Sequence, residues 1–587
     1  MESHRCSRGM LLAGALAAAA ALAGCQRAER TGAGLSTSRS GGRAAAPAGA
    51  EAALQAAMRD STAWASYGRD QTNQRYSPLA TINRDNVRGL TLVWQYHTGV
   101  PRALETSPIM LDGTLYLSTA LDHVIALDAA TGARRWEYAP SLSTTVHCCG
   151  PVNRGVALYG GRVYVGTLDG RLVALDARNG KEVWEERVGD NERGYALDAA
   201  PVAADGKVII GISGAEYGIR GYVSAYDAGT GKLAWRFYTI PSPEEGGWWG
   251  RWARTDAFGT DLHRDIARER ADSGKYADAW KTGGGSMWQA PAIDRELGLV
   301  IFSVGNASPD LDGAKRPGDN LYTNSIVALD LRTGRLKWYF QELPHDVWDL
   351  DATSPVVLVD VPDSAGHPVH AVAEAGKTGW VYVLDRATGK PIRRSDAFVP
   401  QENMFAHPTP DGIRMLPGAN GGSEWSPTAY SPATGFLYVL GLHQPMYYKV
   451  KSQPLEPPAF WLGGAFYGTG EPQYGLFSAV DLRTGRIAWQ NRVRDPMIGG
   501  ALATAGGLVF TGTKDKQFLA FDARTGRQLW SYQADAGVNA PPVTYAVGNR
   551  QFVVVAAGGN YQINAPRGDA ILAFALDTAQ APPSGAE

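Results

Sequence analysis

The sequence has few cysteines, little charge and no covalent haem motif. Only four of its 587 residues are cysteine, two of them adjacent, and no CxxCH sequence occurs. The missing motif excludes an attached c-type haem. Charged residues make up 19% of the chain, the formal net charge is -2, and long basic runs are absent. This balance gives no electrostatic reason to expect nucleic acid as a partner.

The N-terminus has the pattern of an export signal. Two arginines precede an apolar stretch over residues 10–23, which ends in the small-residue sequence LAGC. The stretch is too short and too rich in alanine for a comfortable membrane span. We interpret residues 1–25 as a lipoprotein signal peptide with a lipobox ending at Cys25, which would be lipidated; a plain cleaved signal is the alternative. The protein would then be periplasmic and tied to the membrane only by acyl chains, and Gln26 points to the outer membrane.

Three further segments follow the signal. Residues 26–57 are mostly Ala, Gly, Ser and Arg with almost no large apolar side chains, so we expect a flexible tether. Residues 58–578 are expected to form one folded domain. Residues 579–587 are expected to be a disordered tail.

One sequence motif recurs along the folded segment, in forms such as VIALDAATGARRW, LVALDARNGKEVW, IVALDLRTGRLKW and FLAFDARTGRQLW. Alternating apolar residues predict a strand, Asp-x-x-Thr-Gly predicts a turn with glycine at positive φ, and the tryptophan begins the next strand. Predicted hairpins such as SPIMLDGTLYLST lie between the copies of this motif. One hairpin and one copy of the motif together predict a four-stranded blade.

Counting the hairpins predicts an all-β, eight-bladed β-propeller with tryptophan-containing repeats. The hairpins start near Ser107, Gly155, Ala200, Ala290, Ser354, Ser426, Gly500 and Ala540. The last blade lacks the tryptophan ending, whereas Trp94 lies in an early strand without a hairpin. We therefore expect this N-terminal strand to complete the last blade and close the ring; an open-ended solenoid is the alternative. The longest insertion lies between Thr239 and Gly284, and one such loop is expected to cover a substrate pocket.

The segment HCCGPVNRG contains the adjacent pair Cys148 and Cys149, which in an exported protein should form a disulfide. With its Asn-Arg, this segment resembles the PQQ-dependent alcohol dehydrogenases, the quinoprotein family that includes methanol and ethanol dehydrogenases. The resemblance extends from WASYGRDQTNQRYSPLATIN to NAPPVTY, nearly the whole mature chain. It implies that the disulfide covers one face of pyrroloquinoline quinone (PQQ) and that Arg154 reaches a quinone oxygen or carboxylate.

A planar, polyanionic cofactor needs apolar surfaces on its faces and cations at its rim. In GGGSMWQAP, Trp288 would cover the other face, although core packing is the ordinary role of a lone tryptophan. By the same resemblance, Lys377 in AGKTGWVYVLDR would meet the quinone oxygens, and Glu105 in LETSPI a cofactor carboxylate or nearby backbone. The remaining expected cofactor contacts are Ser213, Gly214, Ala215, Ser286 and Trp425.

The resemblance also implies one metal ion. Glu216 in ISGAEYGIRGY, Asn306 in SVGNASP, and Asp349 and Asp351 in PHDVWDLDA would be its ligands. Such hard oxygen ligands suit calcium or a lanthanide rather than zinc. Asp349 falls where the family has its catalytic base, and Asp351 where lanthanide-dependent members have an extra carboxylate. Three anionic ligands favour a trivalent ion, but a related WDxD in the glucose dehydrogenase branch leaves calcium open.

Four positions depart from the family pattern. Asp198 stands where relatives usually have Thr, Glu424 where they often have Asn, Ile498 where methanol dehydrogenase has Trp, and Asn560 at another family Trp. Two extra carboxylates near a tricarboxylate cofactor would weaken its binding unless they are protonated, displaced or offset.

The expected function is periplasmic oxidation of an alcohol, sugar or polyol to an aldehyde or ketone. The metal would polarise the quinone carbonyl, Asp349 would take the hydroxyl proton, and electrons would pass to a separate acceptor such as a soluble cytochrome c or a quinone. The alternative is a non-catalytic propeller lipoprotein that acts as a scaffold or sensor.

Overall fold

A computed structural model describes residues 47–143, 146–363 and 365–577. The predicted signal peptide, the lipidation site Cys25, most of the tether and the C-terminal tail lie outside the described residues. Among the residues that are described, no helix is both long and apolar enough to cross a membrane.

The end of the predicted tether is folded, so that prediction is wrong for residues 50–57. They belong to helix α1 (Ala50–Arg59), whose buried residues Ala50, Leu54 and Met58 are spaced by four. This stripe packs with Ala157 and neighbouring residues of β7. Alanine is the strongest helix former, and two large apolar side chains on one face are enough to dock a short helix.

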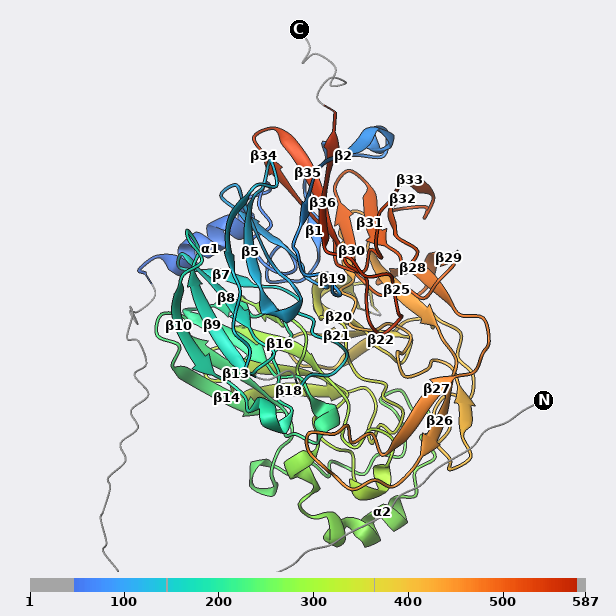
Figure 1. Ribbon diagram of the computed structural model, residues 1–587. Coiled ribbons are helices and arrows are strands. Elements are labelled where there is room, and N and C mark those ends of the chain that lie inside the picture. Colours follow the sequence, from blue (N-terminus) through green and yellow to red (C-terminus); the bar gives the residue numbers. More distant parts are fainter. Residues whose placement is uncertain (1–46, 144–145, 364, 578–587) are drawn as a thin grey trace, which may run out of the picture. The chain divides into compact units, whose positions relative to one another are not determined.

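Strands dominate the described residues, as predicted for an all-β chain, and Figure 1 shows the sheets following one another in chain order. The first four sheets consist of β3 (Ile109–Leu111), β4 (Thr114–Ser118), β5 (Val124–Asp128) and β6 (Arg134–Tyr138); β7 (Ala157–Tyr159), β8 (Arg162–Gly166), β9 (Arg171–Asp176) and β10 (Glu182–Arg187); β11 (Val202–Ala204), β12 (Lys207–Gly211), β13 (Tyr222–Asp227) and β14 (Leu233–Tyr238); and β15 (Ala292–Asp294), β16 (Leu299–Val304), β17 (Ser325–Asp330) and β18 (Leu336–Gln341).

Four more sheets continue the series. They consist of β19 (Val357–Pro362), β20 (Pro368–Ala375), β21 (Val381–Asp385) and β22 (Pro391–Arg394); β24 (Ala429–Ser431), β25 (Phe436–His443), β28 (Tyr474–Asp481) and β29 (Ile487–Val493); β1 (Tyr76–Ser77) with β30 (Ala501–Thr504), β31 (Leu508–Gly512), β32 (Gln517–Asp522) and β33 (Gln528–Gln533); and β34 (Val543–Val547), β35 (Arg550–Ala557) and β36 (Ala570–Leu576) with β2 (Leu90–His97). A small extra sheet holds β23 (Ile413–Met415), β26 (Met446–Val450) and β27 (Gly464–Gly468). The 239–284 insertion carries helix α2 (Ile266–Asp272).

The sheets pack on the next sheet in the series through a tryptophan of the outer strand, except that β22 contains no tryptophan. Trp136 Nε1 donates to the Ala177 carbonyl at 2.9 Å in the next sheet. Its ring covers Gly180, whose φ is +69° and where a Cβ would lie 2.5 Å from the ring. Only glycine satisfies both the positive φ and the close approach. This is why the repeat pairs the turn glycine with a tryptophan.

The early strand β2 pairs antiparallel with β36, with Trp94 opposite Ala573. Trp530 Nε1 in β33 donates to the Leu90 carbonyl at the start of β2. One apolar cluster joins β30–β33, β2 with β34–β36, and β3–β5. The first and last parts of the folded chain therefore share a core.

The strand order determines where the loops lie. In an up-and-down sheet, the connection between the second and third strands and the connection to the next sheet emerge at the same end. The Asp-x-x-Thr-Gly turns lie between the third and fourth strands, at the opposite end. One end is therefore free to carry irregular loops with polar side chains.

Candidate active site

The loops at that end line a cavity of about 380 Å³. Five of them join the second and third strands of their sheets: three carry Glu216, Asn306 and Lys377, and the other two carry Phe460 and Gln562. Further loops precede first strands. They bring in the remaining predicted lining residues, which are Cys148, Cys149, Arg154, Ser286, Trp288, Asp349 and Asp351, while Ser213, Gly214 and Ala215 accompany Glu216. The predicted residues Glu105 and Trp425 lie directly behind the lining.

Two flat or apolar groups line this cavity, as a planar cofactor requires. Cys148 and Cys149 form the predicted disulfide. Trp288 lines the same cavity from the loop before β15, and Ser286 Oγ accepts a hydrogen bond from Ala215 N at 3.1 Å. The disulfide and the tryptophan ring therefore fit a flat conjugated ring.

Arg154 is the first of two buried cations beside the cavity. It pairs with Glu105 Oε2 at 3.0 Å and Asp198 Oδ2 at 2.8 Å. Its guanidinium also lies 5.0 Å and 5.1 Å from the ring centroids of Trp288 and Trp425. The two carboxylates and the two aromatic faces offset the cost of burying this charge.

Glu105 is buried behind this cation. Burial raises the pKa of Glu105 to about 7, against the lowering effect of Arg154. Asn560 Nδ2 donates to Glu105 Oε1 at 2.8 Å. Two departures from the family pattern, Asp198 and Asn560, thus belong to one hydrogen-bonded group around Arg154, and the extra carboxylate of Asp198 is offset by the arginine.

Lys377 is the second buried cation. Its Nζ lies 2.9 Å from both Asp349 Oδ1 and Asp351 Oδ1, and 3.7 Å from Glu424 Oε1. Burial alone would lower the pKa of Lys377, but these carboxylates outweigh burial and raise it. Glu424, the second extra carboxylate, is therefore also placed beside a cation.

A carboxylate-rich wall lies beside Lys377. Burial raises the pKa of Glu216 to about 7 and that of Asp310 well above its ordinary value. Within the described residues, Asn306 Nδ2 and Asp310 Oδ1 are buried without a hydrogen-bond partner. In the described part of the chain, no group of three or more His, Cys, Asp or Glu side chains is arranged to coordinate a metal ion. Asp349 and Asp351 instead form ion pairs with Lys377. The donor set itself, all oxygen and largely anionic, fits a hard cation.

Asp310 was missed at the sequence level. It follows Asn306 by four residues in the same loop between β16 and β17, and this spacing was the available signal. Asn420, Gln562 and the apolar residues Phe460, Leu462 and Phe466 also line the cavity without belonging to a recognisable motif.

Comparisons with known proteins identify the family. The family model "Glucose/ethanol/alcohol dehydrogenase, beta-propeller domain" of the PQQ group matches residues 64–402 and 458–553. Quinohemoprotein alcohol dehydrogenase ADH IIB of Pseudomonas putida is 38% identical, across 91% of this chain and 80% of that protein. The chain belongs to the PQQ-dependent alcohol dehydrogenase family.

Solved structures give the same result for the fold of this family member. Quinohemoprotein alcohol dehydrogenase from Comamonas testosteroni superposes with a TM-score of 0.79 and 34% identity, across 91% of this chain and 84% of that one. A europium-containing methanol dehydrogenase also gives a TM-score of 0.79, with 29% identity, across 89% of this chain and all of that one. The predicted propeller architecture is thereby confirmed.

In this quinoprotein dehydrogenase, the loop that carries Asp349 is held by buried hydrogen bonds. Asp346 accepts from the backbone N–H groups of Trp348 and Leu350, both at 2.9 Å, and from Asn324 Nδ2 at 3.0 Å. Asp349 itself has a φ of +59°. Such a backbone persists only when its surroundings fix it, which the Asp346 contacts do.

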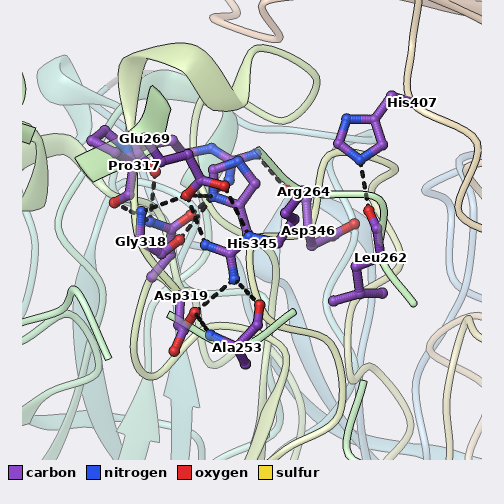
Figure 2. Close-up of polar contacts among 12 residues, drawn as sticks. Ala253, Leu262, Arg264, Glu269, Pro317, Gly318, Asp319, His345, Asp346 and His407 are labelled. Atoms are coloured by element: carbon purple, nitrogen blue, oxygen red, sulfur yellow. Dashed lines mark hydrogen bonds and ion pairs between the residues drawn. The ribbon is translucent and has the colours of Figure 1, made fainter. Parts of the chain in front are cut away.

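A second network ties this loop to the insertion that holds α2 (Figure 2). Glu269 in α2 pairs with Arg264 through both carboxylate oxygens, at 3.0 Å and 2.7 Å, and accepts from Gly318 N at 2.9 Å. Burial lowers the pKa of His345 well below its usual range, and the positive charge of nearby Arg264 lowers it further. The neutral ring then donates from Nδ1 to the Gly318 carbonyl at 2.8 Å. The insertion supports the loop of Asp349 from behind, whereas none of its residues from 240 to 283 lines the cavity.

Proposed function

We propose that the protein oxidises an alcohol to an aldehyde or ketone in the periplasm, using PQQ and one metal ion, and passes the electrons to a separate acceptor such as a soluble cytochrome c. The observation that carries this proposal is a single cavity that joins a vicinal disulfide, a tryptophan, two cations and a carboxylate-rich wall. A scaffold or sensor would not need this combination.

The eight large sheets would be the eight blades of one closed ring. Support comes from the hydrophobic clusters that join each sheet to the next, and from the pairing of β2 with β36. Closure would remove the exposed sheet edges and hold the site loops in fixed positions around the cavity.

Within the cavity, PQQ would lie between the Cys148–Cys149 disulfide and Trp288, with Arg154 and Lys377 against its oxygens. Bound there, the quinone supplies a hydride acceptor and the metal ion a Lewis acid. The chain supplies the proton acceptor, which is Asp349. Its Oδ1 accepts a hydrogen bond from Lys377 Nζ at 2.9 Å, which holds the carboxylate at the cavity.

Glu216, Asn306, Asp349 and Asp351 would hold the ion, and Asp310 would face it. We favour a lanthanide over calcium because carboxylates outnumber cationic side chains in the cavity. Six carboxylates line it, those of Asp198, Glu216, Asp310, Asp349, Asp351 and Glu424, against Arg154 and Lys377. Attraction between an ion and such a surplus grows with the charge of the ion.

Reconstitution of the purified apoprotein with PQQ and either lanthanum or calcium tests this function by dye reduction with an alcohol. Asp349→Asn should lower kcat by about 10²–10⁴-fold, the usual contribution of a general base. The exposed Asp411→Asn variant is the matched control and should retain wild-type turnover. Turnover with lanthanum that is lost in Asp351→Ser supports the trivalent ion; equal turnover with calcium in both proteins argues against it. Unaltered turnover in Asp349→Asn, or no PQQ binding, would refute the enzyme.

The predicted anchor is part of the same proposal. The lipobox LAGC supports lipidation at Cys25 in the outer membrane. Cys25→Ala should release the protein from the membrane fraction into the periplasmic extract. Membrane association that persists in this variant would contradict the anchor.

A further inference from the structure

Two buried glutamates behind the cavity have no part in the proposed reaction. Glu342 follows β18 and Glu374 lies in β20, and each is only 1% exposed. They are neighbours, because a Cβ on Gly376 would lie 3.0 Å from Glu342 Oε2 and 3.1 Å from Glu374 Oε2. Neither side chain lines the cavity. Two carboxyl groups buried together are costly unless something compensates their charge.

Three of the four oxygens of this pair have no hydrogen-bond donor. No N–H or O–H group of the described residues donates to Glu342 Oε1, Glu342 Oε2 or Glu374 Oε2. The fourth oxygen, Glu374 Oε1, accepts from Ser354 N at 3.2 Å. A proton on one carboxyl supplies the missing donor, because that carboxyl can then donate to the other.

The surroundings favour such a proton. Burial raises the pKa of Glu374 to about 8. Burial, and then the charge of Glu374, raise the pKa of Glu342 well above its ordinary value. Lys377 follows Glu374 by three residues, but its Nζ pairs with Asp349 and Asp351 in the cavity. The two glutamates therefore keep at least one proton at neutral pH and are joined by a strong hydrogen bond.

The pair lies where two loops of the active site begin. Glu342 starts the connection from β18 to β19, which carries Asp349, and Ser354 lies near the end of the same connection. Glu374 comes just before the connection that carries Lys377. Through Glu342 and Ser354, Glu374 is thus bonded to both ends of the Asp349 loop. Asp349 and Lys377 meet at 2.9 Å only while these two loops keep their relative positions.

We propose that Glu342 and Glu374 share a proton and act as positioning residues that hold the loop of Asp349 against the loop of Lys377. The inference rests on the proposed function, which gives Asp349 and Lys377 their roles. Loss of this hydrogen bond would displace the base from the cation that orients it. Small displacements of this kind reduce catalysis strongly.

Substitutions in the pair separate positioning from simple packing. Glu374→Gln keeps an oxygen for Ser354 N and supplies an N–H group for Glu342, so kcat and the Kd of PQQ should stay within about twofold of the wild-type values. Glu342→Leu removes one partner and should lower kcat and raise the Kd of PQQ, each by about tenfold. Gly180→Ala disturbs the packing of two sheets at their opposite end and is the control; it should lower Tm and leave both values unchanged.

Infrared spectroscopy of the PQQ- and metal-loaded protein tests the proton itself. At pH 7 the wild type should show the carbonyl absorption of protonated carboxyl groups. This absorption should decrease by at least the equivalent of about one carboxyl in the double variant Glu342→Gln/Glu374→Gln. The exposed Glu192→Gln variant is the control and should retain the wild-type absorption.

The outcomes separate this inference from the proposed function. Wild-type kcat and Kd in Glu342→Leu would overturn the positioning role and leave alcohol oxidation intact. A tenfold weaker Glu374→Gln, or an unchanged carboxyl absorption in the double variant, would overturn the shared proton and indicate a cation or water between ionised glutamates. If Glu342→Leu does not fold, Glu342→Leu/Glu374→Leu replaces both buried partners by apolar side chains and takes its place, with the same expected losses. Absence of PQQ-dependent turnover in the wild type overturns both the inference and the proposed function.

Discussion

Replacing Glu105 by glutamine should stabilise the protein, and more so at pH 8 than at pH 5. The pKa of Glu105 is raised to about 7 in the folded chain, from an ordinary value of 4.5. The folded protein thus holds a proton that the unfolded chain has lost, so stability falls as the pH rises from 4.5 through 7. Glutamine resembles the protonated form and removes this loss.

The size of the gain follows from the two pKa values. A shift of one unit corresponds to about 1.4 kcal/mol, so the full gain in unfolding free energy is about 3 kcal/mol at pH 8. At pH 5 the unfolded carboxyl is only partly ionised, and the gain is about 1 kcal/mol. For a chain of 587 residues, the unfolding entropy converts these values to roughly 2–3 °C and 1 °C in Tm.

Thermal unfolding of the metal- and PQQ-free protein at both pH values measures this difference. The exposed Glu192→Gln variant is the control and should match the wild type at both. A Tm gain that is the same at pH 5 and pH 8 would refute the reasoning, as would a loss at pH 8. Either result would mean that the bond to Arg154 outweighs burial of the charge.

Two further predictions concern the packing of the sheets and the charge at the cofactor. Gly180→Ala places a Cβ 2.5 Å from Trp136 at positive φ, whereas a Cβ at Gly161, also at positive φ, would meet no atom within 4 Å. Gly180→Ala should therefore lower Tm by about 1–3 °C more than Gly161→Ala, as expected for overpacking. Equal shifts in Tm would contradict a tight tryptophan contact. Asp198→Asn removes a negative charge 2.8 Å from Arg154. Because PQQ is anionic, its Kd measured by fluorescence titration should fall by about five- to tenfold. Weaker binding would show that Asp198 is needed to orient the arginine.

The fold could be predicted from sequence because its turns are local. Asp128 Oδ1 accepts from the N–H groups of Ala130 and Thr131 and from the Thr131 hydroxyl, so the Asp-x-x-Thr-Gly turn forms from consecutive residues. The alternating strands on either side have the same local character. Helix α1 could not be predicted in this way, because a short alanine-rich segment is marginal alone and is fixed here by packing on β7.

The sequence by itself determined the repeat and the vicinal disulfide, because each depends on neighbours in the chain. The motif residues that line the cavity were predicted from the resemblance to a known family. Only the tertiary structure decided which charges meet. Lys377 joins Asp351 and Glu424 from different loops. The placement of Phe460 in the cavity lining was likewise decided by the tertiary structure. Such contacts depend on how successive sheets bring their loops to one end, and no local pattern in the sequence encodes that arrangement.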